Sequence, residues 1–452
     1  MRSSAPDSRP VALTIAGSDS GGGAGIQADL ATMAAHGAFG TSVVTAVTAQ
    51  HTRGVERTFQ LPLEEVAGQL AAVRDDFDVR AAKTGMLATT EIVEAVADRA
   101  AAFDFPLVVD PVMVATSGDR LLEPAAERAY ETLITEATVV TPNADEAEVL
   151  SGIPVDDEES AREAGERLCD LGADAALVKG GHVPGETVRD VLVSADGTVA
   201  FEHPRIDTDA THGSGCALSA AIAARLATGD ELRTAIERSV DFLARAVRYH
   251  YDVGRGPGAV NHLVGLRNEA ARESTVEAVR SIGEELAASD VSTVVPRDGA
   301  AVVGATPSAE SVDDVATLEG EFSETKPGRR TGDVRFGRSS DGARVLLAAR
   351  EHASAGLRFA VGCRHTEAVA TALETLEWTV FAANRDRGSN SESALDLDAA
   401  AATNARGGTA EDAAGRPTPV AVIDGSRSTV WIAATDAEAL PDSLREVQAR
   451  VS

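Results

Sequence analysis

The sequence predicts an α/β protein with a mostly parallel sheet that carries helices on both faces, followed by a second, smaller α/β domain. From Val11 to about Leu263, short apolar runs alternate with amphipathic stretches. The apolar runs are "VALTIAG", "TSVVTAVTAQ", "PLVVDPVMV", "ATVVTPN" and "AALVKGG", and the helical stretches include "EEVAGQLAAVRDDF" and "EIVEAVADRAAAF". Continuous apolar strands that alternate with helices are typical of a parallel sheet buried on both faces.

Two further features complete the first domain. The segment "VRDVLVSADGTVAFEHPRI" predicts a hairpin that closes on an Asp-Gly turn, at an antiparallel edge of the sheet. The pattern changes after "GRGPGAVNHL", and 452 residues exceed a typical single core. We therefore expect a domain boundary near residue 265, which gives domains 1–265 and 266–452.

The second domain is expected to begin with a helix, "ESTVEAVRSIGEELAAS", and a strand, "TVVPRDGAAVVG". An arginine-rich turn, "KPGRRTGDVRFGRSSDGAR", and two helix–strand units follow. Residues 384–419 are acidic, rich in small residues and aperiodic, which predicts a long flexible insertion. The segment "TPVAVIDGSRSTVWIAATD" predicts a final hairpin.

The charge balance excludes two classes of partner. A net charge of −30 repels nucleic acid and anionic lipid. The only lysines are Lys83, Lys179 and Lys326, and this acidic, lysine-poor composition indicates either adaptation to concentrated salt or a GC-rich genome, or both together. In such a chain each remaining lysine is a candidate for a specific role.

The composition also predicts the compartment. No apolar run is long enough for a membrane span, and "MRSSAPDSRP" lacks the apolar segment of a signal peptide. The three cysteines are odd in number and far apart, which favours a reducing cytoplasm over a disulfide scaffold.

Candidate site residues follow the apolar runs, because ligands of open parallel sheets bind beyond the carboxyl ends of the strands. "GSDSGGGAGIQADL" fits either a ligand-binding loop or a tight turn, and Asp29 within it fits either a ligand or a solvated helix residue. Asp110 could hold a metal-phosphate or cap a turn. Asn143 and Glu146 could bind a ligand or form a capping pair. For Lys179 a phosphate-binding role is favoured over a solvated one.

The stretch "DTDATHGSGCALSAAIAA" predicts an anion site. Gly213, Ser214 and Gly215 offer successive backbone N–H groups at the start of a helix, which suits a transferring phosphoryl group. A thiol at such a position is expected to have a lowered pKa, so Cys216 could act as a base. The alternative is a small residue packed beneath the glycine turn.

Together these segments resemble the ribokinase-like superfamily, and within it the hydroxymethylpyrimidine and phosphomethylpyrimidine kinases of thiamine biosynthesis. The resemblance is carried, in order, by "TIAGSDSGGGAGIQADL", "AVTAQHT", "KTGML", "VVDPVMVATSG", "TPNADEAEVLSG", "LVKGGH" and "DTDATHGSGCALSAAIAA". It implies ATP-dependent phosphorylation of the hydroxymethylpyrimidine and then of its monophosphate. A pyridoxal kinase of the same fold is the alternative.

The resemblance also implies residue roles. The pyrimidine would be bound by Asp29, Gln50, Met86 and Gly17; the ATP phosphates by Lys179, Asn143 and Thr208; Mg²⁺ by Asp110 and Glu146; and the anion hole would be Gly213 to Cys216, with Cys216 assisting deprotonation. The implied partners are small molecules and a second copy of the chain, because kinases of this fold commonly dimerise.

The second domain resembles the ThiN-type thiamine phosphate synthase in "VRFGRSSDGARVLLAAREH", "RFAVGCRHTEAVATALETLEWTVFAANRDR" and "PTPVAVIDG". Arg335, Arg338 and Arg344 are the diphosphate candidates, or else plain surface cations. Three segments depart from the family pattern: Asp341 stands where a histidine follows the paired serines, "GCR" replaces an asparagine-bearing segment, and "GSRSTV" replaces a glycine-lysine-glutamate segment. Either a synthase or a non-enzymatic sensor of thiamine phosphate is therefore expected, and His365 is a weak substitute for the missing histidine.

Overall fold

The computed structural model describes residues 7–113, 127–181, 183–289, 291, 293–296, 301–318, 333–376, 378–384, 396–403, 418–425 and 427–451. The chain forms two compact units, Met1–Val264 and Gly265–Ser452. Residues 114–118 of one quoted motif, together with His182 and Lys326, lie outside the described residues. No helix among the described residues is long and apolar enough to cross a membrane.

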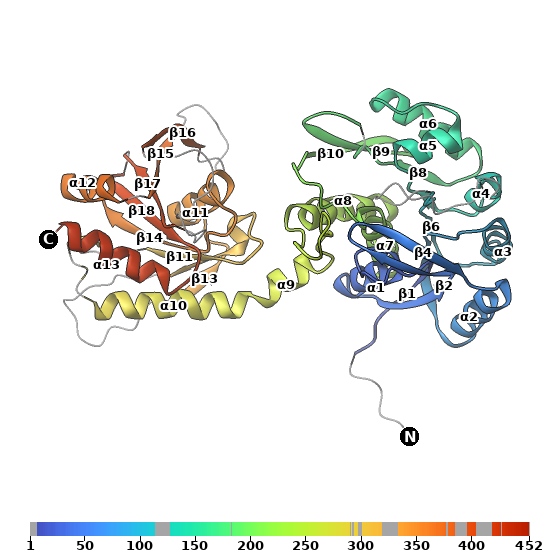
Figure 1. Ribbon diagram of the computed structural model, residues 1–452, viewed down its shortest axis with the longest axis horizontal. Coiled ribbons are helices and arrows are strands. Elements are labelled where there is room, and N and C mark those ends of the chain that lie inside the picture. The colour runs from blue at the N-terminus through green and yellow to red at the C-terminus, as the bar shows by residue number, and fades with distance from the viewer. Residues whose placement is uncertain are drawn as a thin grey trace, which may run out of the picture. The chain divides into compact units, whose positions relative to one another are not determined.

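The first unit is built on an eight-stranded sheet in the order β10-β9-β8-β7-β6-β5-β1-β2 (Figure 1). Neighbouring strands from β8 to β2 are parallel, and β9 and β10 add an antiparallel edge. The predicted fold class and the predicted edge hairpin are confirmed. The strands are β1 (Val11–Ala16), β2 (Phe39–Val44), β5 (Val79–Thr84), β6 (Leu107–Val109), β7 (Val139–Val140), β8 (Ala175–Val178), β9 (Thr187–Ser194) and β10 (Gly197–Pro204).

Helices cover both faces of this sheet because alternate residues of its short central strands point to opposite sides. Val109 and Val140 pack with α2 (Leu63–Asp76), α3 (Thr90–Ala100), α4 (Glu127–Ile134) and α6 (Glu158–Asp170). Val108 and Val139 pack with α7 (Ser214–Ala227) and α8 (Leu232–Arg248) on the other face. Helix α1 (Gly25–Ala35) packs beside α7, and α5 (Ala144–Ser151) packs beside α6.

One apolar run does not form the single strand that it predicts. "TSVVTAVTAQ" is divided between β2 and β3 (Ala46–His51), and β3 pairs with β4 (Gly54–Gln60) in a separate two-stranded ribbon. The Thr45 N–H donates to the Ala16 carbonyl oxygen at the point where the chain leaves the main sheet. Gln50 therefore lies on the ribbon and not at a strand end of the main sheet.

The second unit is also α/β, with an eight-stranded sheet in the order β13-β12-β11-β14-β18-β17-β15-β16 (Figure 1). Its pairs are antiparallel except for β15 with β17. Helices α10 (Arg272–Ala288), α12 (Glu367–Thr375) and α13 (Ala439–Val451) cover one face, and α11 (Asp341–His352) covers the other. The strands are β11 (Val302–Ala305), β12 (Val315–Leu318), β13 (Val334–Phe336), β14 (Phe359–Arg364), β15 (Thr379–Asn384), β16 (Asp396–Thr403), β17 (Val420–Asp424) and β18 (Thr429–Ala434).

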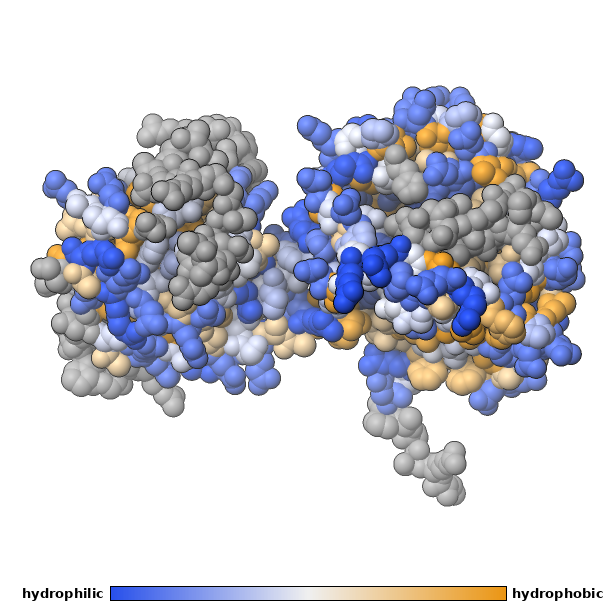
Figure 2. Space-filling model, in the orientation of Figure 1, coloured by the Kyte–Doolittle hydropathy of each residue, from blue (hydrophilic) through white to orange (hydrophobic). Residues whose placement is uncertain are grey.

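Several expectations for the second unit need correction. The strand expected over 293–304 is limited to β11, because residues 293–295 form a turn. The arginine-rich segment contains strand β13, and the aperiodic segment contains strand β16, which pairs with β15. The final hairpin is confirmed as β17 and β18. The visible face of each unit is mostly hydrophilic (Figure 2), as the charged composition predicts.

Candidate active site

A cavity of about 600 Å³ lies at the carboxyl ends of the parallel strands of the first unit. Its lining comes from the loops after β1, β5, β6, β7 and β8 and from the turn that begins α7. Parallel strands bring these loops to one edge of the sheet, although they are far apart in the sequence. Of the predicted site residues, the cavity is lined by Gly17, Gln50, Met86, Asp110, Asn143, Glu146, Lys179, Gly213, Ser214, Gly215 and Cys216.

The turn that leads into α7, residues 212–216 (the anion turn), has the backbone shape of an anion site. Gly213 has φ +83°, and a Cβ there would lie 1.8 Å from the Gly23 carbonyl oxygen, so only glycine fits. The Ser214 N–H donates to the carbonyl oxygen of Thr211, which removes it from the expected set of donors. The N–H groups of Gly215 and Cys216, in the first helical turn, remain the candidates, because such groups have no partner within a helix.

The thiol of Cys216 does not have the lowered pKa that its helix position predicts. Cys216 is partly exposed and lines the cavity, yet the protein around it raises its pKa to about 11. Although the residue keeps some exposed surface, desolvation of its sulfur by the surrounding protein is the main cause, and Asp29 and Asp110 raise the pKa further. Lys83 and the Gly25 N–H lower it, but by less. The desolvation cost of a thiolate therefore exceeds the benefit of the helix start.

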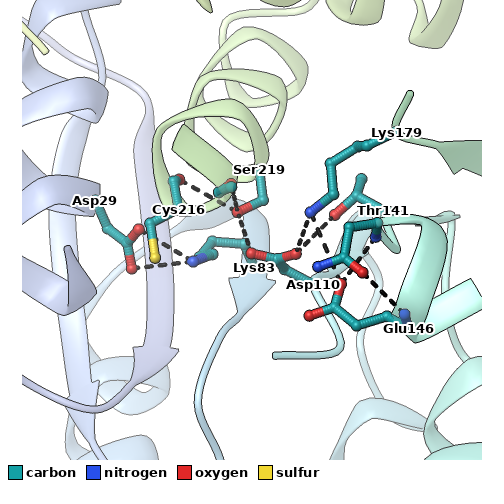
Figure 3. A network of polar contacts seen from close by, with 10 residues as sticks. Asp29, Lys83, Asp110, Thr141, Glu146, Lys179, Cys216 and Ser219 are labelled. Carbon is teal, nitrogen blue, oxygen red and sulfur yellow. Dashed lines mark hydrogen bonds and ion pairs between the residues drawn. The ribbon is translucent and has the colours of Figure 1, made fainter. Parts of the chain in front are cut away.

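Asp29 does not line the cavity. Its carboxylate lies 3.0 and 3.1 Å from Nζ of Lys83 and accepts a 2.6 Å hydrogen bond from the Thr14 hydroxyl (Figure 3). Both charged side chains have no exposed surface. Burial alone would lower the pKa of Lys83, but the charges of Asp29, Cys216 and Asp110 raise it above its ordinary value. The pair is a buried ion pair behind the cavity wall, so the geometry does not support Asp29 as a direct ligand.

A second charged cluster does line the cavity (Figure 3). Nζ of Lys179 lies 3.2 Å from Oδ1 of Asp110 and 4.0 Å from Oε2 of Glu146. The Asp110 carboxylate also accepts hydrogen bonds from Thr141, at 3.3 Å, and from Ser219, at 3.3 Å. Because the Ser219 hydroxyl also lies 3.2 Å from the Cys216 carbonyl oxygen, this carboxylate is tied to the helix that carries the anion turn.

Glu146 and Asn143 have a structural role as well as a place in the cavity. The Asn143 side chain accepts from the Glu146 N–H, and the Glu146 carboxylate accepts from the Asn143 N–H, which forms a capping box at α5. Burial, together with the charge of Asp110, raises the pKa of Glu146 to about 7. The capping alternative is thus realised, and both residues still face the cavity.

Asp110 and Glu146 fit a Mg²⁺ ion that a nucleotide brings with it. Among the described residues, no group of three or more His, Cys, Asp or Glu side chains could hold a metal alone. Mg²⁺ is typically bound by one or two carboxylates, waters and substrate phosphates. Two carboxylates would therefore be enough for a Mg²⁺ ion that is also bound by nucleotide phosphates and waters.

Gln50, Met86 and Gly17 form a less charged part of the cavity lining. A Cβ on Gly17 would lie 2.4 Å from Cε of Met86, so the glycine makes room for the methionine. The Gln50 side-chain oxygen lies 3.2 Å from the Thr48 hydroxyl, which donates its proton over the shorter distance of 2.7 Å to the Ser18 carbonyl oxygen. Thr208 is not among the lining residues, and its hydroxyl accepts from the Ala210 N–H.

Sequence patterns did not predict several of the residues that shape the site. Arg205 donates to the carbonyl oxygens of Gly181, Val183 and Gly185 and holds the loop that follows Lys179. The buried Asp190 accepts from the Gly180 N–H at 2.8 Å. The rarity of lysine was a usable signal for Lys83, whereas nothing in the local sequence marks Asp190 or Arg205.

The diphosphate candidates of the second unit lie on one stretch of the chain, from β13 to α11. Arg335 is exposed on β13 and pairs with Asp333 at 3.4 Å, Arg338 is exposed, and Arg344 is partly buried on α11. Asp341 forms an ion pair with Arg427. Arg427 belongs to the "GSRSTV" segment, so this ion pair joins two of the three segments that depart from the family pattern. The positive charge of Arg427 offsets the negative charge that Asp341 places beside the diphosphate candidates.

The parallel sheet, the glycine-bounded anion turn and the lysine–carboxylate cluster define a phosphotransferase with the ribokinase-like fold. Residues 19–261 match the family model described as phosphomethylpyrimidine kinase, and the chain belongs to this family. Residues 278–425 match the model of thiamine-phosphate synthase ThiN.

Individual relatives agree with this classification. The chain is 46% identical to the hydroxymethylpyrimidine/phosphomethylpyrimidine kinase of Streptomyces coelicolor over 258 residues, which cover 57% of this chain and 96% of that protein. It is 47% identical to the thiamine biosynthesis bifunctional protein ThiED of Geobacter sulfurreducens over 266 residues, which cover 58% of this chain and 54% of that protein. Among solved structures it is similar to the ADP complex of Bacillus subtilis pyridoxal kinase, with TM-score 0.53, 34% identity, and coverage of 57% of this chain and 99% of that one.

Proposed function

We propose that the first unit transfers the γ-phosphoryl group of ATP to the hydroxymethyl oxygen of 4-amino-5-hydroxymethyl-2-methylpyrimidine, and then a second phosphoryl group to the resulting monophosphate. The observation that carries this proposal is one cavity lined by two chemically distinct groups of residues. The first group is the anion turn with the Asp110–Lys179 cluster, and the second is Gln50 with Met86. A kinase relative at 46% identity and a bifunctional thiamine biosynthesis protein at 47% identity support it.

The charged residues of the cavity, Lys179, Asp110 and Glu146, suit the triphosphate of ATP. Lys179 supplies a positive charge beside Asp110 and Glu146, and these carboxylates would hold the Mg²⁺ that neutralises charge on the transferring group. In this proposal the N–H groups of Gly215 and Cys216 would donate to the oxygen atoms on which negative charge develops. The bond from the γ-phosphorus to the bridging oxygen of ADP breaks as the bond to the hydroxymethyl oxygen forms, and the hydroxyl proton is released.

Cys216 is proposed to position the acceptor hydroxyl and not to act as a strong base. With a pKa of about 11, the thiol is almost entirely protonated near pH 7. A loose phosphoryl transition state needs little prior deprotonation of the acceptor, so positioning and charge neutralisation supply most of the rate. Replacement of Cys216 by alanine should therefore lower kcat for the first phosphorylation and leave the affinity for the pyrimidine nearly unchanged.

The test compares two acceptors. We would measure kcat/KM for the hydroxymethylpyrimidine and for pyridoxal with the same enzyme, ATP and Mg²⁺, in multimolar KCl and in dilute buffer. The proposal predicts a preference for the pyrimidine. Gln50→Ala should reduce this preference, because Gln50 is the polar side chain beside Met86 that is proposed to recognise the pyrimidine. A higher kcat/KM for pyridoxal would instead support the pyridoxal kinase alternative. The fold similarity to pyridoxal kinases is the reason for testing this acceptor.

For the second unit, we propose binding of a thiamine phosphate-like ligand, either as a synthase or as a sensor. The Asp341–Arg427 ion pair supports a retained anion site, since it neutralises the acid that replaces histidine. Supplying the pyrimidine diphosphate and a thiazole phosphate to the full chain separates the two possibilities. Formation of thiamine phosphate supports a synthase, and binding of thiamine phosphate without turnover supports a sensor.

We further propose that the protein acts in the cytoplasm at high salt and as a homodimer. The net charge of −30 and the three unpaired cysteines support the first part. The oligomeric state is a prediction from the family alone, and sedimentation velocity in multimolar KCl would measure it.

A further inference from the structure

One buried carboxylate, Asp19, joins the glycine-rich loop after β1 to the anion turn before α7. Its Oδ1 accepts from the Gly21 N–H at 2.7 Å, and its Oδ2 accepts from the Gly23 and Ala24 N–H groups at 3.0 and 2.8 Å. The same Oδ2 lies 3.1 Å from Nε2 of His212, the residue that begins the anion turn. Asp19 is thus bonded to three amides of its own loop and to one side chain that is distant in the sequence.

The two segments also approach each other closely, once through the His212 side chain and once through their backbones. A Cβ on Gly23 would lie 2.6 Å from Cδ2 of His212, and a Cβ on Gly213 would lie 1.8 Å from the Gly23 carbonyl oxygen. The His212 carbonyl oxygen accepts from the Val260 N–H, which fixes the turn from a third segment. The loop and the turn are therefore held in direct contact.

The ionisation of Asp19 favours this contact near neutral pH. Burial raises the pKa of Asp19, but the hydrogen bond from His212 and the bonds from the Gly21 and Ala24 amides together hold it below its ordinary value. His212 therefore faces a carboxylate. Because a neutral ring with its proton on Nε2 and a charged ring both donate to that oxygen, the bond does not require protonation of His212.

On its other side the glycine-rich loop contacts the strand that carries Gln50. The Ser20 hydroxyl donates to the Gln50 carbonyl oxygen at 2.7 Å and accepts from the Gln50 N–H at 2.8 Å. The Thr48 hydroxyl donates to the Ser18 carbonyl oxygen at 2.7 Å. The loop therefore lies between the strand proposed to recognise the pyrimidine and the turn proposed to receive the phosphoryl group.

We propose that Asp19 and His212 are positioning residues, which fix the anion turn relative to the Gln50 strand so that the acceptor hydroxyl and the transferring phosphoryl group meet. This inference rests on the proposed kinase function of the first unit. Asp19 holds the glycine-rich loop through its bonds to three amides, and His212 connects the anion turn to this loop through its bond to Asp19. Loss of their bond should misplace the turn while the strand and Lys179 stay in position, so kcat should fall while substrate affinity is kept.

Two substitutions at one position separate this role from a merely structural one. The amide nitrogen of glutamine can take the place of Nε2 of histidine, whereas that of asparagine is too short and takes the place of Nδ1. His212→Asn should lower kcat roughly 10- to 100-fold, since a misplacement of about 1 Å costs about 10²-fold, with KM for the pyrimidine within about twofold. His212→Gln should recover most of the lost kcat.

The matched control is His36→Asn. His36 is a partly buried histidine of the same unit whose Nδ1 lies 2.8 Å from the Thr32 carbonyl oxygen, at the end of α1. This variant should keep the parental kcat. Equal kcat for the asparagine and glutamine variants at 212, or a loss that appears only in KM, would overturn the proposal.

Hydrogen exchange measured by mass spectrometry gives a readout that needs no substrate. Amides of residues 213–216 should exchange faster in His212→Asn and in Asp19→Asn than in the parent or in His36→Asn, while peptides of β5 should be unchanged. If the parent phosphorylates no pyrimidine, the proposed function fails, and the exchange data still decide whether the pair fixes the turn. Unchanged exchange at 213–216 in both variants would overturn the positioning role.

Discussion

Loss of the Asp29 charge should destabilise the first unit strongly. Both members of the Asp29–Lys83 pair have no exposed side-chain surface, and the contacts are 3.0 and 3.1 Å. In Asp29→Asn the buried ammonium of Lys83 would lose the carboxylate that lies in contact with it. Breaking such a pair costs about 3–5 kcal/mol. Because a typical domain is stable by about 5–15 kcal/mol, this variant should lose a large part of the stability of the unit.

A second variant tests whether the cause is the uncompensated charge. Asp29→Asn combined with Lys83→Met removes both charges, keeps an acceptor for the Thr14 hydroxyl and fills the volume of the lysine chain. We expect it to recover at least half of the loss, since a buried ion pair contributes little beyond what a well-packed apolar side chain gives. The exposed pair Arg162–Glu159 provides the control, and Glu159→Gln should leave the transition unchanged.

The chain offers an internal reference for this measurement. Both tryptophans, Trp378 and Trp431, belong to the second unit, and all three tyrosines, at positions 130, 249 and 251, belong to the first. Urea unfolding followed by far-UV circular dichroism and by tryptophan fluorescence should show the loss only in the dichroism. A loss below about 1 kcal/mol in Asp29→Asn, or a double variant as unstable as the single one, would refute the account of the buried pair.

Three further outcomes are expected. Alkylation of Cys216 by iodoacetamide, mapped by mass spectrometry, should accelerate from pH 8 towards pH 11, because its pKa is raised to about 11; a plateau below pH 8 would contradict this. Glu146→Gln should stabilise the first unit more at pH 8 than at pH 5 in thermal unfolding, because the raised folded-state pKa of about 7 makes ionisation costly from the unfolded value of 4.5 upwards; equal shifts at both pH values would be inconsistent with it. Gly213→Ala should abolish kinase activity and lower Tm by more than Gly229→Ala, because both glycines have positive φ but only the first Cβ meets backbone, at 1.8 Å; equal effects would contradict the close approach of turn and loop.

The main sheet of the first unit could be predicted from sequence because its signal is local. Buried parallel strands need continuous apolar runs, and the helices between them show one apolar face, so both are visible in short windows. The separation of β3 from β2 was not visible, since "TSVVTAVTAQ" has no breaking residue and the division depends on contacts with β1 and β4. Strand β16 was missed because its residues, "DLDAAAAT", carry neither β-branched periodicity nor a turn signal on both sides.

The site was predicted less completely than the fold. Lys179, Asp110 and the glycine turn follow strands or begin a helix, and such positions can be located in a sequence. The partner of Asp29 could not, because Lys83 is 54 residues away and the pair joins helix α1 to strand β5 only in the folded chain. The raised pKa of Cys216 depends on packing, which a helix-start argument does not contain. Asp19 and His212 lie 193 residues apart and meet only through the folded backbone.

The most direct test of the central claim is mass-spectrometric product analysis of the purified full-length chain. The protein would receive the hydroxymethylpyrimidine, ATP and Mg²⁺ in multimolar KCl, with Lys179→Met as the inactive control because Lys179 is the cation beside Asp110 and Glu146. The account predicts that the pyrimidine monophosphate appears first and the diphosphate follows, with one ADP for each phosphoryl group and neither product in the control. ATP consumption without any phosphorylated pyrimidine, or equal product from Lys179→Met, would contradict it.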